Sequence, residues 1–267
     1  MPAHLQLHAA ARPGSRRFHL SGAVGFAVVF ATALLGGSPS LSAADSKAAR
    51  ALARITPPPF TEVFHDPFQH QLGPGWSWVR EDRSAWRVTA DALEIRIQPG
   101  NMWGGANNAR NLLVRPAPDP AQQAVAAEVR IENRPTEQYE QVDLVWYYSD
   151  KAMVKIGQEL VDGKLSLVMG REEADRTRTI AIIPLEGDRL EVRLVAEGTQ
   201  IRGEFRTPPD QVWQRAGSCE LPIDGAPKLS LMAYQGPAAT ERWVKLSSFR
   251  VATRAPAKPT AAGSKQP

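Results

Sequence analysis

The sequence contains almost no cysteine and few histidines. Its 267 residues include one cysteine, Cys219, and five histidines, of which only His65 and His70 lie beyond residue 44. A single cysteine excludes an intramolecular disulfide, and with it the small secreted domains that depend on disulfides. The two histidines do not show a spacing typical of zinc sites. No partnering base is near Cys219 in the sequence, so we expect it to be a half-buried small hydrophobic residue and not a nucleophile.

Common catalytic motifs are also missing. There is no phosphate-binding glycine loop and no Ser-His-Asp arrangement. Acidic pairs occur at Glu137 with Glu140 and at Glu172 with Glu173, but we expect both pairs in loops, where no separation is fixed. Scattered loop carboxylates such as Asp66 are a weak signal for calcium. The sequence therefore predicts no catalytic residue, no metal and no cofactor.

Long hydrophobic runs are rare, and the clearest one lies near the N-terminus. Residues 24–35 are apolar, follow a region with three arginines, and precede the small residues Ser42-Ala43-Ala44. This order is typical of an export signal with a cleavage site. The run is shorter than the roughly 20 residues of a membrane span. We therefore predict that residues 1–44 are a signal peptide, that the protein is periplasmic or extracellular, and that no membrane span remains after cleavage. The alternative is an uncleaved anchor.

Positive charge is concentrated outside the central part of the chain. The formal net charge is +4, but residues 1–44 contribute three arginines and no acids, residues 45–59 a net +2, and residues 252–267 a net +3. Residues 60–251 therefore carry a net −4. This balance gives no support for nucleic-acid binding, and we predict no nucleic-acid partner.

The sequence lacks helix-period segments of useful length and instead has short alternating strands between turn signals. In residues 92–98, for example, Leu93, Ile95 and Ile97 alternate with charged residues. This pattern is typical of an all-β sandwich. We predict one folded domain over residues 60–252, after a proline-rich linker (45–59) and before a disordered tail (253–267). The strands are predicted over residues 60–64, 76–78, 86–88, 92–98, 124–131, 179–183, 190–196, 200–207, 228–234 and 243–251, with three more within 141–171.

Two hairpins within residues 141–171 define a sheet with two unlike faces. Asp162-Gly163 favours a type I′ turn, since both central positions of that turn need positive φ. A three-residue loop, 149–151, is expected to close the preceding hairpin. Side chains alternate along a strand, so these turns decide which residues share a face. The predicted pairs are Leu160 with Leu165, Gln158 with Leu167, Ile156 with Met169, Lys155 with Gly170, Gly157 with Val168 and Glu159 with Ser166; Val142, Leu144 and Trp146 are expected on the core side.

The opposite face of this sheet is the best candidate for a ligand site. Sugar recognition needs planar hydrogen-bonding groups for hydroxyls and an aromatic ring to stack on the sugar, and this face together with a Gly/Asn-rich loop supplies both. The alternatives are a solvated sheet face with an ion pair and, for Trp103, a side chain that plugs one end of the sandwich. The candidate ligand-binding residues are Trp103, Asn107, Asn111, Gln141, Asp143, Tyr147, Lys155 and Glu159.

Several short motifs resemble those of one superfamily. They are Phe64-x-Asp66-x-Phe68, Trp76-Ser77-Trp78, Asn111-Leu112-Leu113, Gln141-x-x-Leu144-x-x-Tyr147-Tyr148-x-Asp150, Val154-Lys155-x-Gly157-x-Glu159 and Lys245-Leu246-x-x-Phe249-x-Val251. Over residues 60–252 the chain resembles the concanavalin A-like lectin/glucanase superfamily. It is most similar to a branch of unknown function that includes the "regulation of enolase" proteins, with the C-terminal module of family 43 β-xylosidases as a sister branch.

The resemblance implies a jelly-roll sandwich with a concave, sugar-binding sheet face. The chain departs from the family at Asp143, where glycine is common at or near this position, and at residues 172–176, which replace a Ser-Asp-Trp-Ser stretch. The glucanase motif E-x-D-x-x-E is begun by Glu173 and Asp175, but no acid closes it.

Three hypotheses about function follow. The first is an exported, non-catalytic module that binds a glycan or polysaccharide on the concave sheet face. The second is an envelope module that binds a protein partner or has a structural role. The third is a glycoside hydrolase with a non-standard arrangement of carboxylates.

Overall fold

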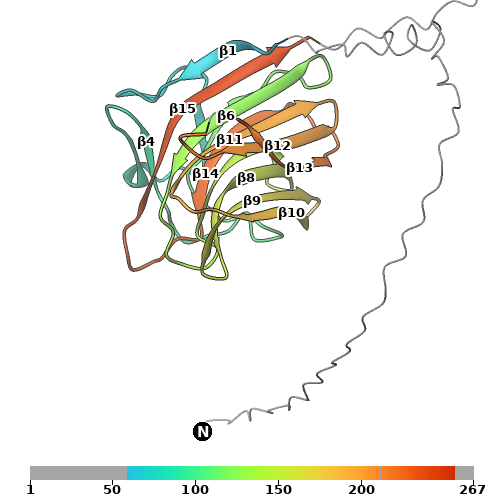
Figure 1. Ribbon diagram of the computed structural model, residues 1–267. Helices are drawn as coiled ribbons and strands as arrows, with labels where there is room; N and C mark the ends of the chain where they lie inside the picture. Colours follow the sequence, from blue (N-terminus) through green and yellow to red (C-terminus); the bar gives the residue numbers. More distant parts are fainter. Residues whose placement is uncertain (1–58, 211, 256–267) are drawn as a thin grey trace, which may run out of the picture. The chain divides into compact units, whose positions relative to one another are not determined.

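The computed structural model describes residues 59–210 and 212–255, which form a β-sandwich of two packed sheets (Figure 1). Paired strands in both sheets run antiparallel. The predicted all-β, two-sheet fold is thereby confirmed. The predicted signal peptide, the linker up to residue 58 and the tail from residue 256 lie outside the described residues.

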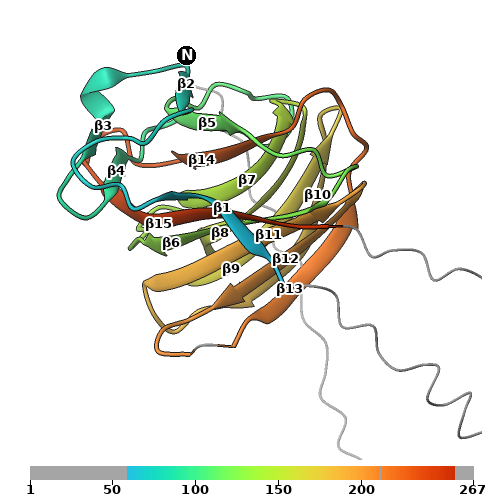
Figure 2. The ribbon, with the colours of Figure 1, turned by 90° about the horizontal axis from the view of Figure 1, so that it is seen from above.

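The seven-stranded sheet contains the three consecutive strands predicted within residues 141–171. The strand order is β10 (Arg176–Pro184), β9 (Lys164–Glu173), β8 (Ala152–Val161), β7 (Gln141–Ser149), β14 (Lys228–Tyr234), β5 (Leu112–Pro116) and β2 (Ser77–Val79). Figure 1 shows two of the three predicted strands, β8 and β9, side by side with β10, and Figure 2 shows the same sandwich turned by 90°.

The eight-stranded sheet joins the first described strand of the chain to the last. β1 (Thr61–Asp66) pairs with β15 (Trp243–Arg254), so the predicted opening and closing strands lie side by side. A 3-10 turn, η1 (Arg83–Ala85), precedes β3. The remaining order is β13 (Gln214–Glu220), β12 (Gln200–Arg206), β11 (Arg189–Glu197), β6 (Ala124–Glu132), β15, β4 (Leu93–Arg96) and β3 (Trp86–Val88).

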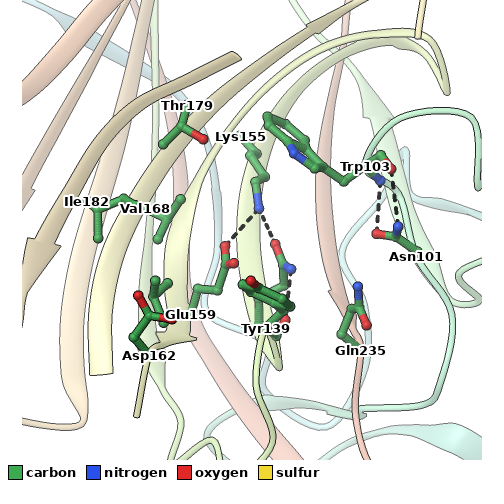
Figure 3. Close-up of a pocket in the computed structure, with 12 residues that line it drawn as sticks. Asn101, Trp103, Tyr139, Lys155, Glu159, Asp162, Val168, Thr179, Ile182 and Gln235 are labelled. Atoms are coloured by element: carbon green, nitrogen blue, oxygen red, sulfur yellow. Dashed lines mark hydrogen bonds and ion pairs between the residues drawn. The ribbon is translucent and has the colours of Figure 1, made fainter. Parts of the chain in front are cut away.

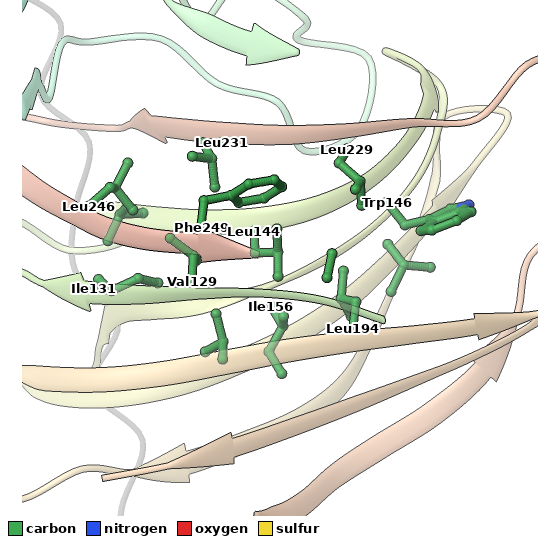
Figure 4. Packing of buried hydrophobic residues seen from close by; sticks show 14 of the residues in the cluster. Val129, Ile131, Leu144, Trp146, Ile156, Leu194, Leu229, Leu231, Leu246 and Phe249 are labelled. Atoms are coloured by element: carbon green, nitrogen blue, oxygen red, sulfur yellow. The ribbon is translucent and has the colours of Figure 1, made fainter. Parts of the chain in front are cut away.

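The main core lies between the two sheets (Figure 4). Leu144 and Trp146 of β7 and Ile156 of β8 are completely buried in it, as the alternating pattern predicts. Val129 and Leu194 reach the same core from the eight-stranded sheet. Burial of apolar surface contributes roughly 25 cal/mol per Å², so a core of this kind can stabilise a domain without disulfides.

The predicted register of the second hairpin is confirmed. Leu160 pairs with Leu165, and Asp162 and Gly163 have φ of 50° and 73°, as a type I′ turn requires. The first hairpin differs in detail. Its turn consists of two residues, because Ser149 pairs with Ala152 and a bulge beside Tyr147 takes up the extra residue. Beyond the bulge the register is the predicted one, and so the two faces keep their predicted members.

A loop covers part of the outer face of the seven-stranded sheet and buries it. Met102 and Ala109 of residues 100–111 pack on Val145, Tyr147 and Met153 in a second apolar cluster, which also includes Leu112, Val114, Met232 and Tyr234. The alternative of a solvated sheet face is therefore wrong for this region. Trp103 does not plug an end of the sandwich but lies on this outer face, against Gly170 of β9.

The structure differs from the sequence-based prediction at two strands and at one acidic pair. The prediction did not include β5, which directly follows the Gly/Asn-rich loop, or β13, which lacks apolar alternation. Glu172 and Glu173 lie within β9 and not in a loop. Among the described residues there is no helix long and apolar enough to cross a membrane.

Candidate functional site

A pocket of about 450 Å³ lies on the outer face of the seven-stranded sheet (Figure 3). Its walls come from β7, β8, β9 and β10, from the loop that carries Trp103, and from the residue that follows β14. The pocket is lined by Asn101, Trp103, Tyr139, Gln141, Lys155, Glu159, Val161, Asp162, Val168, Thr179, Ile182 and Gln235.

Lys155 is the central group of the pocket floor. Its Nζ donates to Glu159 Oε2 at 3.1 Å and to Gln141 Oε1, and it lies 4.0 Å from Asp143 Oδ2. The ammonium also lies 5.0 Å from the centre of the Trp103 ring, within range of a cation–π interaction. Lys155 is only 3% exposed, so this paired geometry is what makes its charge tolerable at that depth.

Two buried acids of the same sheet, Asp143 and Glu172, have raised pKa values. Burial raises the pKa of Asp143 to about 7, the charge of Glu159 adds to this effect, and Lys155 opposes it. The Tyr234 hydroxyl lies beside Asp143 without closing a hydrogen bond, and neither Asp143 oxygen has a hydrogen-bond donor. Burial likewise raises the pKa of Glu172 to about 6, although Gly104 N donates to its Oε2 at 3.0 Å.

Two glycines make this packing possible. A Cβ at Gly157 would lie 1.9 Å from the Val142 carbonyl oxygen and 2.6 Å from Asp143 Oδ1. A Cβ at Gly170 would lie 2.5 Å from Cη2 of Trp103. A methyl group at either glycine would occupy the space that the Asp143 carboxylate or the Trp103 indole now fills. Because both positions are glycine, Asp143 packs directly on the backbone of β8 and Trp103 on the backbone of β9.

The Trp103 loop is tied down by its own hydrogen bonds. Asn101 Oδ1 accepts from the backbone N–H groups of Met102 and Trp103 at 2.9 and 3.0 Å. Arg80 fastens the base of the loop, since its Nε donates to the Ala109 carbonyl oxygen at 2.6 Å. The indole is therefore held in place before any ligand arrives, which lowers the entropy cost of stacking on it.

The rim of the pocket combines exposed apolar groups with strained backbone. Tyr139 and Ile182 are 48% and 51% exposed, which is high for such side chains. Tyr139 and Gln235 have φ of 68° and 63°, a left-handed conformation that is uncommon outside glycine. Such strain gathers at binding and active sites more often than elsewhere.

The structure brings four of the eight predicted site residues together at the pocket surface: Trp103, Gln141, Lys155 and Glu159. Asp143 lies directly beneath them, completely buried.

The other three lie elsewhere. Tyr147 packs in the second apolar cluster and donates to Asp150 Oδ1 at 2.7 Å. Asn111 is buried and accepts from Asp82 N at 2.7 Å, while Asn107 lines a separate hollow beside Arg80.

Other pocket residues were not predicted. Tyr139 could have been found by extending the alternation of Gln141 and Asp143 two residues back, past the start of the strand. Gln235 could not, because the pairing of β14 with β7 joins residues about 90 apart in sequence and has no local signal. Within residues 59–210 and 212–255 no group of three or more histidine, cysteine or acidic residues could hold a metal ion.

Residues 65–224 match the family model of the β-xylosidase C-terminal concanavalin A-like domain. The chain belongs to this family. The match confirms the resemblance to the concanavalin A-like superfamily and to the modules of family 43 β-xylosidases. A comparison with curated proteins gave no match.

Solved structures support the same fold for this concanavalin A-like domain. A family 43 protein of Bacillus licheniformis is 19% identical with a TM-score of 0.62, over 72% of this chain and 39% of that one. A xylan β-1,4-xylosidase of Bacillus halodurans is 16% identical with a TM-score of 0.62, over 74% and 41%. The chain thus spans about two fifths of these enzymes. A Saccharomyces cerevisiae protein of unknown function is 15% identical with a TM-score of 0.54, over 68% and 97%.

Proposed function

We propose that this concanavalin A-like domain is an exported, non-catalytic module that binds a carbohydrate in the pocket on its seven-stranded sheet. One observation carries the proposal: the pocket joins a held indole, an exposed tyrosine and several planar hydrogen-bonding side chains around one hollow. Aromatic rings can stack on the apolar face of a sugar, and amide and carboxylate groups can bind its hydroxyls.

The size and openness of the site agree with this function. A volume of about 450 Å³ falls within the usual range of small-molecule sites, which is enough for a short stretch of a glycan. Family membership adds support of a weaker kind, because related modules occur in enzymes named for xylan, and fold alone does not determine function. Export is supported by the signal-like residues 1–44.

A non-catalytic role is favoured by the placement of the acids. Hydrolysis of a glycosidic bond needs an acid with a raised pKa that reaches the leaving oxygen, together with a second carboxylate. Asp143 has the raised pKa, but its side chain has no exposed surface. Glu159 lines the pocket and is already engaged by Lys155.

A glycan array probed with residues 56–255 tests the proposal. We expect binding that Tyr139→Ala weakens at least tenfold, because the exposed ring would stack on the sugar. Ile223→Ala, at an exposed apolar residue away from the pocket, is the matched control and should bind as the wild type does. Binding to no glycan, or binding indifferent to Tyr139, would refute the proposal and favour an envelope protein partner. Release of reducing sugar from a bound glycan would instead support a hydrolase.

A further inference from the structure

The charged groups of the pocket point to the kind of sugar that it accepts, an inference that rests on the proposed function. Lys155 is the only cation among the residues that line the pocket, and Glu159 and Asp162 are the anions. Which of these charges a ligand can reach depends on how each one is already paired.

Lys155 has little capacity left for a ligand. Its ammonium donates to Glu159 Oε2 and Gln141 Oε1, while Asp143 Oδ2, at 4.0 Å, is too far for a hydrogen bond. The Lys155 residue is only 3% exposed, so a ligand can reach the ammonium only by moving one of these two acceptors. The Trp103 ring lies 5.0 Å away on another side. An acidic sugar would have to displace one of these partners, and would leave a buried carboxylate or amide unpaired.

Glu159, in contrast, keeps one oxygen for a ligand. Its Oε2 accepts from Lys155, whereas no protein donor among the described residues contacts its Oε1. Glu159 is only 8% exposed, and it lines the pocket with its carboxylate turned toward Lys155 (Figure 3). This carboxylate oxygen is therefore free to accept at the pocket surface, and a ligand that supplies a charged donor would form a charge-assisted hydrogen bond with it.

The surroundings of Glu159 increase the preference for a positive donor. Asp162 lines the same pocket, so two carboxylates, those of Glu159 and Asp162, share the lining with a single cation, Lys155. The faces of Trp103 and Tyr139 carry negative quadrupole potential, which also attracts cations.

We propose that the pocket selects a glycan that carries an unacetylated amino group, with the ammonium at Glu159 Oε1, and rejects glycans that carry carboxylates. The charged hydrogen bond to Glu159 provides the selectivity, and the aromatic walls hold the sugar ring.

Three β-1,4-linked tetrasaccharides with the same backbone test this inference: cellotetraose, its fully 2-amino counterpart and its fully 6-carboxylate counterpart. Titration calorimetry of residues 56–255 at pH 6 should give about tenfold tighter binding of the amino sugar than of cellotetraose, and weaker binding of the carboxylate. Glu159→Gln keeps the acceptor for Lys155 but removes the charge, so it should abolish the advantage of the amine. Glu62→Gln on β1, in the other sheet, should leave the ranking unchanged.

The possible results separate the inference from the proposed function. If cellotetraose binds as well as the amino sugar, or if the amine advantage survives Glu159→Gln with an unchanged melting temperature, the inference fails and carbohydrate binding stands. If no tetrasaccharide binds, both fail. Glu159→Asp places the negative charge on a shorter side chain. If Glu159→Gln loses the preference for the amino sugar because the charge is gone, Glu159→Asp should recover part of that preference.

Discussion

The outer faces of the two sheets carry similar residues in very different states. On the eight-stranded sheet, Glu191 accepts from Arg130 at 2.6 Å and from Arg206, and the Trp213 ring lies 4.3 Å from Arg193. The side chains of Arg130, Arg193 and Arg206 remain partly exposed, at 51%, 23% and 24%. On the seven-stranded sheet, charges of both signs are buried under an indole and a loop. A polar sequence pattern therefore does not distinguish a solvated ladder from a buried cluster.

The difference arises from what covers each face. Residues 100–111 fold back over the seven-stranded sheet, and glycines in β8 and β9 leave room for what the loop brings. Charges taken out of water must be matched by close partners, whereas exposed pairs contribute about 0–1 kcal/mol. The buried face should thus be far more sensitive to substitution than the exposed one.

The largest effect is expected from removing the buried cation. Lys155→Met would leave Glu159 and Asp143 without their partner, and we expect the free energy of unfolding to fall by about 3–5 kcal/mol in urea titrations. The matched change on the other face is Arg189→Met, whose pair with Glu132 is well exposed, and it should cost about 0–1 kcal/mol. Equal costs for the two substitutions would mean that burial does not distinguish the faces.

The second-largest effect is expected at Gly157, on which Asp143 packs. Gly157→Ala places a methyl group 1.9 Å from the Val142 carbonyl oxygen, so backbone has to move, and we expect a loss of about 3 kcal/mol. Gly187→Ala is the control, because nothing lies within 4 Å of its Cβ position and its φ is not left-handed. Chemical denaturation of both variants measures the difference. A cost near zero for Gly157→Ala would contradict the packing described for β7 and β8.

The two faces should also respond to pH with opposite signs. Burial raises the pKa of Asp143 to about 7, so the native state holds a proton that the unfolded chain releases near pH 4. Stability from this group is complete below about pH 4 and is lost as pH rises to about 7. Burial would also raise the pKa of Glu191, but hydrogen bonds from Arg130 and Arg206 lower it, so its contribution is lost as pH falls through that lowered pKa.

Melting temperatures between pH 4 and pH 8 check this contrast. Asp143→Asn should flatten the decline between pH 4 and pH 7, because the amide does not titrate, while Glu191→Gln should leave that decline in place. A wild-type melting temperature that does not fall over this range, or a decline that survives Asp143→Asn, would show that Asp143 ionises as readily in the folded state as in the unfolded chain.

Local signals were sufficient for most of the strands and for the two faces of the hairpins within residues 141–171. Asp162-Gly163 determined a register through turn geometry, and that register put Lys155 and Glu159 on one face and Ile156 on the other, as found. The cover over the polar face was not predictable in this way. Its contacts join Met102 to Met153 and Gly104 to Glu172, which are far apart in sequence, and no periodicity reports such pairs.

The residues of the candidate site likewise fall into those that local sequence signals predict and those that depend on contacts between distant residues. Gln141, Lys155 and Glu159 follow from strand alternation, and Trp103 from loop composition, and all four line the pocket. Asn111 was chosen by composition as well, but its left-handed φ and its bond to Asp82 give it a structural role that composition cannot reveal. Burial of Asp143 depends on Gly157 across the strand pair and on the loop above it.

The smallest effect expected separates the two tryptophans that lie near charged groups. Trp103→Ala should weaken glycan binding about tenfold, because the Trp103 ring packs on Gly170 at the pocket and Asn101 holds its backbone. The substitution should change the free energy of unfolding little, since the indole is only half-buried. Trp213→Ala removes a ring of the same kind from between Arg193 and Arg206 and should leave affinity unchanged. Titration of both variants with the same glycan tests this prediction. If only Trp213→Ala loses affinity, the binding surface lies on the eight-stranded sheet. The ligand would then contact exposed arginines there and not the buried Lys155.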